Sequence, residues 1–142
     1  MVNLNSDLLS VNDVTILIRG QTNDRPITTA PTVVYNTTDT TIQLIKSDMN
    51  KIYIIDNSSP VRINLPINII ITDIGTWIII QKVGVGNLSV YSSSGTKIED
   101  SATNGYVINN VSSQVWANIG IFLAKIDQWK FLSAPLGTWT TV

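Results

Sequence analysis

The chain has 142 residues and a formal net charge of −1, and only 13% of its residues are charged against 44% that are hydrophobic. A soluble domain usually carries about 25% charged residues, so this chain has no strong field to attract nucleic acid or an anionic membrane surface. It contains neither histidine nor cysteine, which excludes Ser-His-Asp and Cys-His catalysis, disulfides and nearly all structural zinc sites.

The composition predicts an all-β protein. The chain holds 22 Ile, 13 Val and 16 Thr, but only five Ala and a single Glu. β-branched residues favour strands, whereas strong helix formers are scarce here. The length fits one domain, and no segment is long and apolar enough to predict a membrane helix.

Residues 1–40 are predicted to form an N-terminal anchor, or an arm exchanged between subunits, in a partly extended conformation. The first residues show no secretory signal. Residues 14–19 have the pattern of a strand, and residues 32–35 have the pattern of a second, short one. Pro26 and Pro31 favour an extended linker between these two predicted strands, because proline biases its predecessor away from helix.

Residues 41–142 are predicted to form a β-sandwich domain of short strands separated by turns, either a seven- or eight-stranded sandwich or a partial barrel. Two strands show clear faces: Val61, Ile63 and Leu65 alternate with polar residues, and Ala117 to Leu123 alternate in the same way. Residues 76–82 begin apolar on both faces, which indicates a central strand or one packed against another subunit. The remaining strands are expected at 41–46, 51–56, 88–91, 105–109, 115–124 and 128–132.

Gly84-Val85-Gly86 follows a predicted strand and resembles part of a phosphate-binding loop. It lacks a third glycine, a following helix and a lysine at the required spacing. We therefore interpret it as a β-hairpin turn whose glycines supply positive φ angles.

The sequence predicts no catalytic residues, no metal site and no cofactor. Its ten carboxylates are scattered and mostly adjoin turn-forming residues, and the one adjacent pair, Glu99-Asp100, would point to opposite faces of a strand. A glycan hydrolase built from these acids at a subunit interface is the least favoured function. The lysines and arginines are too evenly spread among the acids to predict nucleic-acid binding.

Two groups of residues are candidates for contact with other molecules. The polar segment 92–104 is flanked by aromatic residues and concentrates charge, so a receptor-facing loop is predicted there, formed by Tyr91, Lys97, Glu99, Asp100 and Tyr106. Apolar side chains that strand alternation places away from the core form a candidate subunit interface, consisting of Trp77, Ile79, Trp116 and Phe122.

Residues 53–66, Tyr-Ile-Ile-Asp-Asn-Ser-Ser-Pro-Val-Arg-Ile-Asn-Leu-Pro, resemble a run found in phage and viral fibre or tail-fibre domains. In that run a strand ends in Asn or Asp, Pro-Val begins the next strand and Leu-Pro closes it. Residues 75–90 resemble the hairpin that follows, with a Gly-x-Gly-Asn turn before an alternating strand, and residues 95–98 and 129–132 fit the rest. The likeness spans roughly residues 42–134.

The resemblance implies an antiparallel, jelly-roll-like β-sandwich that forms a homotrimer on the outside of a virion. The expected function is that of a small fibre, head-fibre, decoration or spike protein, with host attachment as a further expected role. It would bind other virion proteins through its N-terminal segment, with a host surface glycan as a further expected partner, and would reach the virion from the host cytoplasm. The alternative is a carbohydrate-binding module or lectin without metal. In neither case is an enzyme, a nucleic-acid partner or membrane insertion expected.

Overall fold

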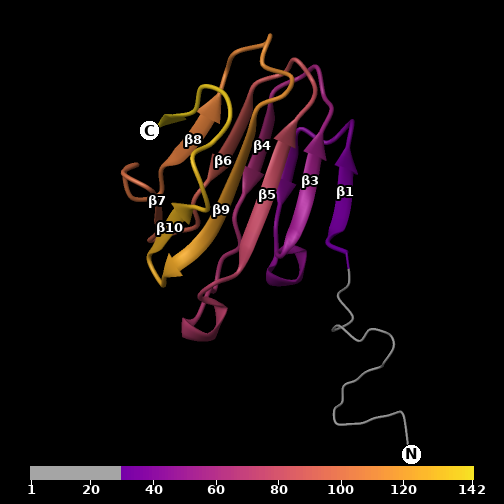
Figure 1. Cartoon of the computed structure of the whole chain (residues 1–142). Coiled ribbons are helices and arrows are strands. Elements are labelled where there is room, and N and C mark those ends of the chain that lie inside the picture. Colours follow the sequence, from indigo (N-terminus) through magenta and orange to yellow (C-terminus); the bar gives the residue numbers. More distant parts are fainter. Residues whose placement is uncertain (1–29) are drawn as a thin grey trace, which may run out of the picture. The chain divides into compact units, whose positions relative to one another are not determined.

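The computed structural model describes residues 30–142, which form a two-sheet, all-β unit (Figure 1). Sheet 1 has six strands in the order β1-β3-β5-β9-β10-β7, and sheet 2 has five in the order β11-β8-β6-β4-β2. The strands are β1 (Thr32–Asn36), β2 (Thr41–Gln43), β3 (Lys51–Ile55), β4 (Val61–Asn64), β5 (Trp77–Lys82), β6 (Leu88–Tyr91), β7 (Lys97–Ile98), β8 (Tyr106–Asn109), β9 (Asn118–Lys125), β10 (Gln128–Phe131) and β11 (Thr140–Thr141).

The first six strands alternate between the two sheets. β1, β3 and β5 pair in parallel in sheet 1, and β2, β4 and β6 pair in parallel in sheet 2. The arrows of β1, β3 and β5 accordingly point the same way in Figure 1. The chain thus forms three stacked arches, each made of one strand in each sheet and the turn that joins them: β1–β2, β3–β4 and β5–β6.

The predicted antiparallel, jelly-roll-like pairing is therefore wrong for the arches. Antiparallel pairs occur only where the later strands are added: β9 on β5, β10 on β9, β8 on β6 and β11 on β8. β7 pairs in parallel with β10. Antiparallel neighbours are joined by short hairpins, whereas parallel neighbours need a longer crossover. Here the strand of the opposite sheet is part of that crossover.

The core lies between the sheets and is built by strand alternation, as the sequence predicts. Val61, Ile63 and Leu65 are buried, and Ile119, Ile121 and Leu123 are fully buried on the facing sheet. β5 lies between β3 and β9 in sheet 1, which confirms the prediction of a central strand. Successive strand residues point to opposite faces, so the residues between these core positions form the outer faces of the two sheets.

The turns of the arches stack backbone against backbone. A Cβ atom added to Gly84 would overlap the backbone of Asn57, and one added to Gly86 would overlap that of Ser59. Gly84 and Gly86 are not among the residues with positive φ, and β5 and β6 lie in different sheets. The prediction of a hairpin turn needing positive φ is therefore wrong: these glycines allow one turn to lie directly against the next.

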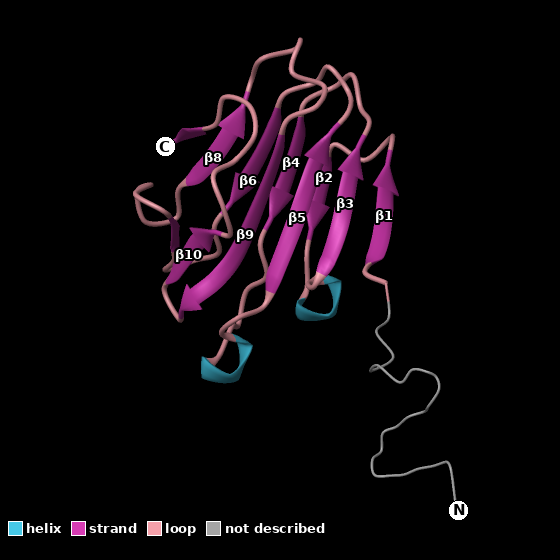
Figure 2. Ribbon diagram, viewed as in Figure 1, coloured by secondary structure: helices cyan, strands magenta, loops and turns pink. Residues whose placement is uncertain are grey.

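At the opposite ends of the arches, longer connections lead from one arch to the next, and each contains a single-turn 3-10 helix (Figure 2). The first, η3 (Lys46–Asp48), joins β2 to β3, and the second, η4 (Ile71–Asp73), joins β4 to β5. The strand predicted over residues 41–46 ends at Gln43 for this reason. Within residues 30–142 no helix is long and apolar enough to cross a membrane.

The expected domain boundary after residue 40 is too late. β1 pairs with β3 along its whole length, and the compact unit begins at Pro31. Residues 31–40 therefore belong to the first arch. The rest of the predicted anchor or arm, including the strand predicted at residues 14–19, lies outside the described residues.

Candidate functional site

Tyr91 and Tyr106, the two aromatic residues of the predicted receptor-facing loop, form a stack on the outer face of sheet 2. They are direct partners in the antiparallel pair of β6 and β8. Their ring centroids are 4.4 Å apart, with 20° between the planes. The guanidinium carbon of Arg62, on the neighbouring strand β4, lies 3.6 Å from the centroid of the Tyr91 ring. The three side chains form a cation–π and aromatic cluster.

The position of Arg62 is fixed from its own strand. Its Nε donates a hydrogen bond of 2.7 Å to Oδ1 of Asn64, which is the register partner of Tyr91. Asn64 and Gln43 continue the same row toward the edge of sheet 2. The row therefore presents two amide side chains beside the two tyrosine rings, which are groups that can hydrogen-bond to and stack against an uncharged ligand.

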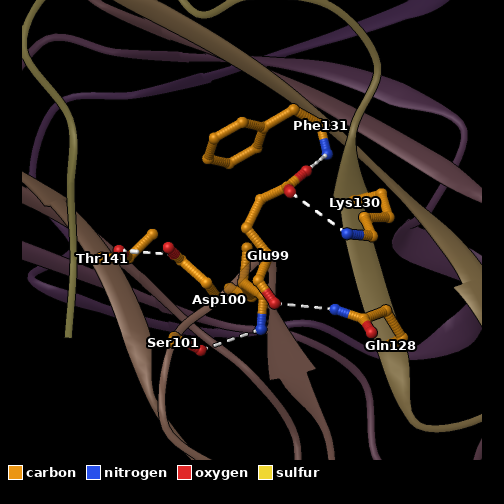
Figure 3. Close-up of polar contacts among 8 residues, drawn as sticks. Glu99, Asp100, Ser101, Gln128, Lys130, Phe131 and Thr141 are labelled. Atoms are coloured by element: carbon orange, nitrogen blue, oxygen red, sulfur yellow. Dashed lines mark hydrogen bonds and ion pairs between the residues drawn. The ribbon is translucent and has the colours of Figure 1, made fainter.

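Glu99, predicted in the same loop, is instead part of the scaffold (Figure 3). Its carboxylate accepts a hydrogen bond of 2.6 Å from the backbone N–H of Phe131 and lies 3.3 Å from Nζ of Lys130. Its carbonyl accepts a further hydrogen bond from Nε2 of Gln128. Glu99 also has a positive φ of 50°, so this turn directs the carboxylate onto β10.

Asp100 and Lys97 complete the predicted loop. Oδ1 of Asp100 accepts a hydrogen bond of 2.9 Å from the hydroxyl of Thr141 (Figure 3), which attaches the loop to β11. Lys97 is half-buried in β7. The five predicted residues therefore divide into a tyrosine pair on sheet 2 and a charged group in and after β7, in which Glu99 contacts β10 and Asp100 contacts β11.

Three of the four predicted interface residues lie together on the outer face of sheet 1. Trp77 on β5 is the register partner of Phe122 on β9, and Ile79 is the partner of Gly120. Ile52 and Ile54 continue this surface onto β3. We refer to Ile52, Ile54, Trp77, Ile79 and Phe122 as the outer apolar face; all five side chains are partly exposed.

Trp116 lies elsewhere. The strand predicted to begin at Val115 begins only at Asn118, so Trp116 belongs to the preceding turn, where it is 53% exposed. The prediction placed Trp116 on the side of the strand that faces away from the core, but the strand alternation does not extend into the turn. It is therefore not part of the outer apolar face.

Lys82 is a buried lysine that was not predicted from the sequence. Its side chain is only 1% exposed, and its Nζ donates one hydrogen bond of 2.9 Å to the carbonyl of Val111. Burial lowers the pKa of this amine below its ordinary value, because a low-dielectric interior disfavours the charged form. The alternation of Ile78, Ile80 and Lys82 could have shown that this lysine points inward.

A small cavity of about 40 Å³ lies between η3 and η4, lined in part by Met49, Ile69 and Trp129. Nζ of Lys46 and Oδ2 of Asp73 form an ion pair of 2.8 Å beside it, and this contact lowers the pKa of the Asp73 carboxyl. Nε1 of Trp129 is buried without a hydrogen-bond partner. The cavity has room for little more than one or two water molecules.

No group of three or more potential metal ligands occurs among residues 30–142. No protein-family model and no curated protein matches the sequence. Two surfaces of the described residues are candidates for function. One is the tyrosine row of sheet 2, which consists of Tyr106, Tyr91, Asn64 and Gln43, and the other is the outer apolar face of sheet 1.

Proposed function

We propose that the chain is a structural subunit of a virus or phage particle, displayed on the particle surface as a homotrimer. In this proposal the outer apolar face is buried between the three copies. The observation that carries the proposal is that face itself, because isoleucine, tryptophan and phenylalanine occupy the centre of a sheet surface, where a monomer would place polar residues.

The low charge of the chain supports the same function. With 13% charged residues, a monomer has few groups with which to keep an apolar sheet surface in solution. Closed symmetric assembly buries such a surface and leaves the polar outer face of sheet 2 toward water. The resemblance of residues 42–134 to fibre domains favours three copies and a virion location.

The substitution Ile79→Lys tests the proposal, because it places a charge at the centre of the outer apolar face. Sedimentation at about micromolar concentration is expected to give the mass of three chains for the unmodified protein and of one chain for the variant. Ile71→Lys is the matched control, since Ile71 is 73% exposed on η4 and away from that face. An unmodified chain that sediments as a monomer would contradict the proposal.

The virion location has its own test. Antibodies against the full chain are expected to label the outside of intact particles in electron micrographs. Labelling that appears only after the particles are opened would show an internal protein.

The second candidate function is carbohydrate binding without metal, and the tyrosine row of sheet 2 favours it. Sugars stack on aromatic rings and hydrogen-bond to amides, and Tyr106, Asn64 and Gln43 supply both kinds of group. On a glycan array, Tyr106→Ala should abolish selective binding, whereas Trp116→Ala, which removes an exposed aromatic elsewhere, should leave it unchanged. Absence of binding by the unmodified chain would leave only the structural function.

A further inference from the structure

The stack of arches is closed at one end and open at the other. At the closed end the antiparallel strands β8 and β9 cover the third arch. At the open end lie β1 and β2, which among residues 30–142 are hydrogen-bonded on one side only. Val34 and Ile42, which pack against the core from these strands, are only partly buried. Stacked repeats generally need a terminal cap to be soluble.

Among the described residues, nothing shows the features that usually protect an edge strand such as β1. This strand is five residues long and contains no charge and no proline, whereas natural edges are usually short, charged or bulged. Its outward side chains are also apolar and exposed, with Val33 at 52% and Tyr35 at 65%. The other sheet edges are shorter: β2 has three residues, and β7 and β11 have two each.

The pattern of hydrogen bonds shows which backbone groups of β1 are available. The carbonyl of Asn36 accepts a hydrogen bond from the N–H of Asp56, directly after β3. Because these groups alternate in direction along a strand, Thr32, Val34 and Asn36 bond to β3. The N–H and C=O groups of Val33 and Tyr35 therefore point to the open edge.

We propose that this edge pairs with β1 of a second copy, in antiparallel orientation about a two-fold axis through Val34. In this register Val33 of each copy faces Tyr35 of the other, so both residues with available backbone groups form hydrogen-bonded pairs. The valine and tyrosine side chains also meet on the same face, as apolar cross-strand pairs do. A shift by two residues in one direction would set Tyr35 against Pro31, which has no N–H.

The occupant is a second copy because the edge is self-complementary. Polar residues lie at both ends of β1, apolar residues lie next to them, and Val34 is at the centre, so a two-fold axis matches like with like. A C2 contact uses the same patch twice and closes on itself. The edge contact is small, so it is expected to be weak and to form at concentrations on the order of 100 µM.

A cysteine at the proposed axis tests the geometry directly. In a non-hydrogen-bonded antiparallel pair the Cα atoms are about 4.5 Å apart, which suits a disulfide, and the chain has no other cysteine. Full-length V34C is expected to form a covalent dimer on oxidation. The control V85C places its thiol at a more exposed position, 51% for Val85, and is expected to remain uncoupled. Equal coupling of both variants, or none of V34C, would overturn the proposal.

Proline substitutions test the pairing without relying on side chains. Tyr35→Pro removes an N–H that points to the open edge and is expected to weaken association at least tenfold relative to Tyr35→Ala, with the melting temperature little changed. Val34→Pro removes an N–H bonded to β3 and is expected to lower the melting temperature instead. If the Tyr35→Pro and Tyr35→Ala variants associate with equal strength, the proposal is overturned. The same result is expected if residues 1–29 of the same chain cover the edge.

The edge contact lies beside the outer apolar face, since Val33 and Tyr35 are the register partners of Ile52 and Ile54. It rests on the backbone groups of β1, however, and is tested separately. In concentrated solution the mass of the unmodified protein is expected to rise above that of three chains, and the mass of Ile79→Lys is expected to rise from one chain to two. If the chain proves monomeric when dilute, so that the proposed trimer fails, doubling of the monomer when concentrated would still support the edge contact. Concentrated protein whose mass does not rise would overturn it.

Discussion

Gly86→Ala is expected to lower the free energy of unfolding by about 3 kcal/mol. The new methyl group would overlap the backbone of Ser59 in the neighbouring turn, and a backbone inside a stack of arches has little room to retreat. Thermal denaturation should show a melting temperature lower by roughly 10 °C.

The control for this substitution lies between the two glycines. Val85 is 51% exposed, so Val85→Ala should change the free energy of unfolding by no more than about 0.5 kcal/mol. If Gly86→Ala is as mild as Val85→Ala, the turns are not stacked as closely as the structure has them.

Lys82→Met is expected to make the protein more stable by about 1–2 kcal/mol at neutral pH. The lysine is 1% exposed and has one hydrogen bond, to the carbonyl of Val111. Methionine has a similar length and removes the cost of burying a charge. Urea denaturation near pH 7 measures the change, and Lys125→Met, at an exposed position, should have almost no effect.

The gain from Lys82→Met should shrink as the pH rises. Burial lowers the pKa of Lys82 below 10.5 in the folded protein, so the unfolded chain binds this proton more tightly. The free energy of unfolding of the unmodified protein therefore rises with pH between the lowered pKa and 10.5. The variant lacks this rise. A difference in the free energy of unfolding between the two proteins that does not change with pH would show that the amine is not responsible for the gain.

Tyr53 sets an upper limit to that pH range. Burial raises its pKa to about 12 from 10.0, so above pH 10 the folded protein holds this proton more tightly than the unfolded chain. Its contribution to stability is present below pH 10 and is lost as the pH rises through 12. The measurements on Lys82 therefore belong between pH 7 and pH 10.

Local patterns predicted the strands well but not their partners. Alternation around Ile63 and Ile121 identified the buried faces because alternation is a property of a single strand. Pairing depends on residues far apart in the chain, and here the spacing between partners is irregular: Lys51 follows its partner Thr32 by 19 residues, and Ile78 follows its partner Lys51 by 27. The sequence therefore contains no repeat of fixed length that would indicate the arches.

The candidate sites show the same division. Alternation along each strand predicts that Trp77, Ile79 and Phe122 point away from the core, but only the pairing of β5 with β9 brings them together. The cluster of Arg62 with Tyr91 depends on the parallel pairing of β4 with β6, which no local pattern contains. Glu99 was expected to face a receptor because charge in a loop is usually solvated, yet its backbone turn aims it at Phe131.

The turns of the arches and the connections between arches should differ in how freely their sequences can change over evolution. The turns that carry Asn57 and Gly86 touch backbone to backbone, so added residues there would break the register of every neighbour. Counted between residues in register, the connection with η4 advances the chain by 16 residues, from Arg62 to Ile78, against 10 in the connection with η3, from Thr41 to Lys51, while the strands remain in register. Insertions, including grafted foreign peptides, should therefore be tolerated at η4 and rejected at the turns.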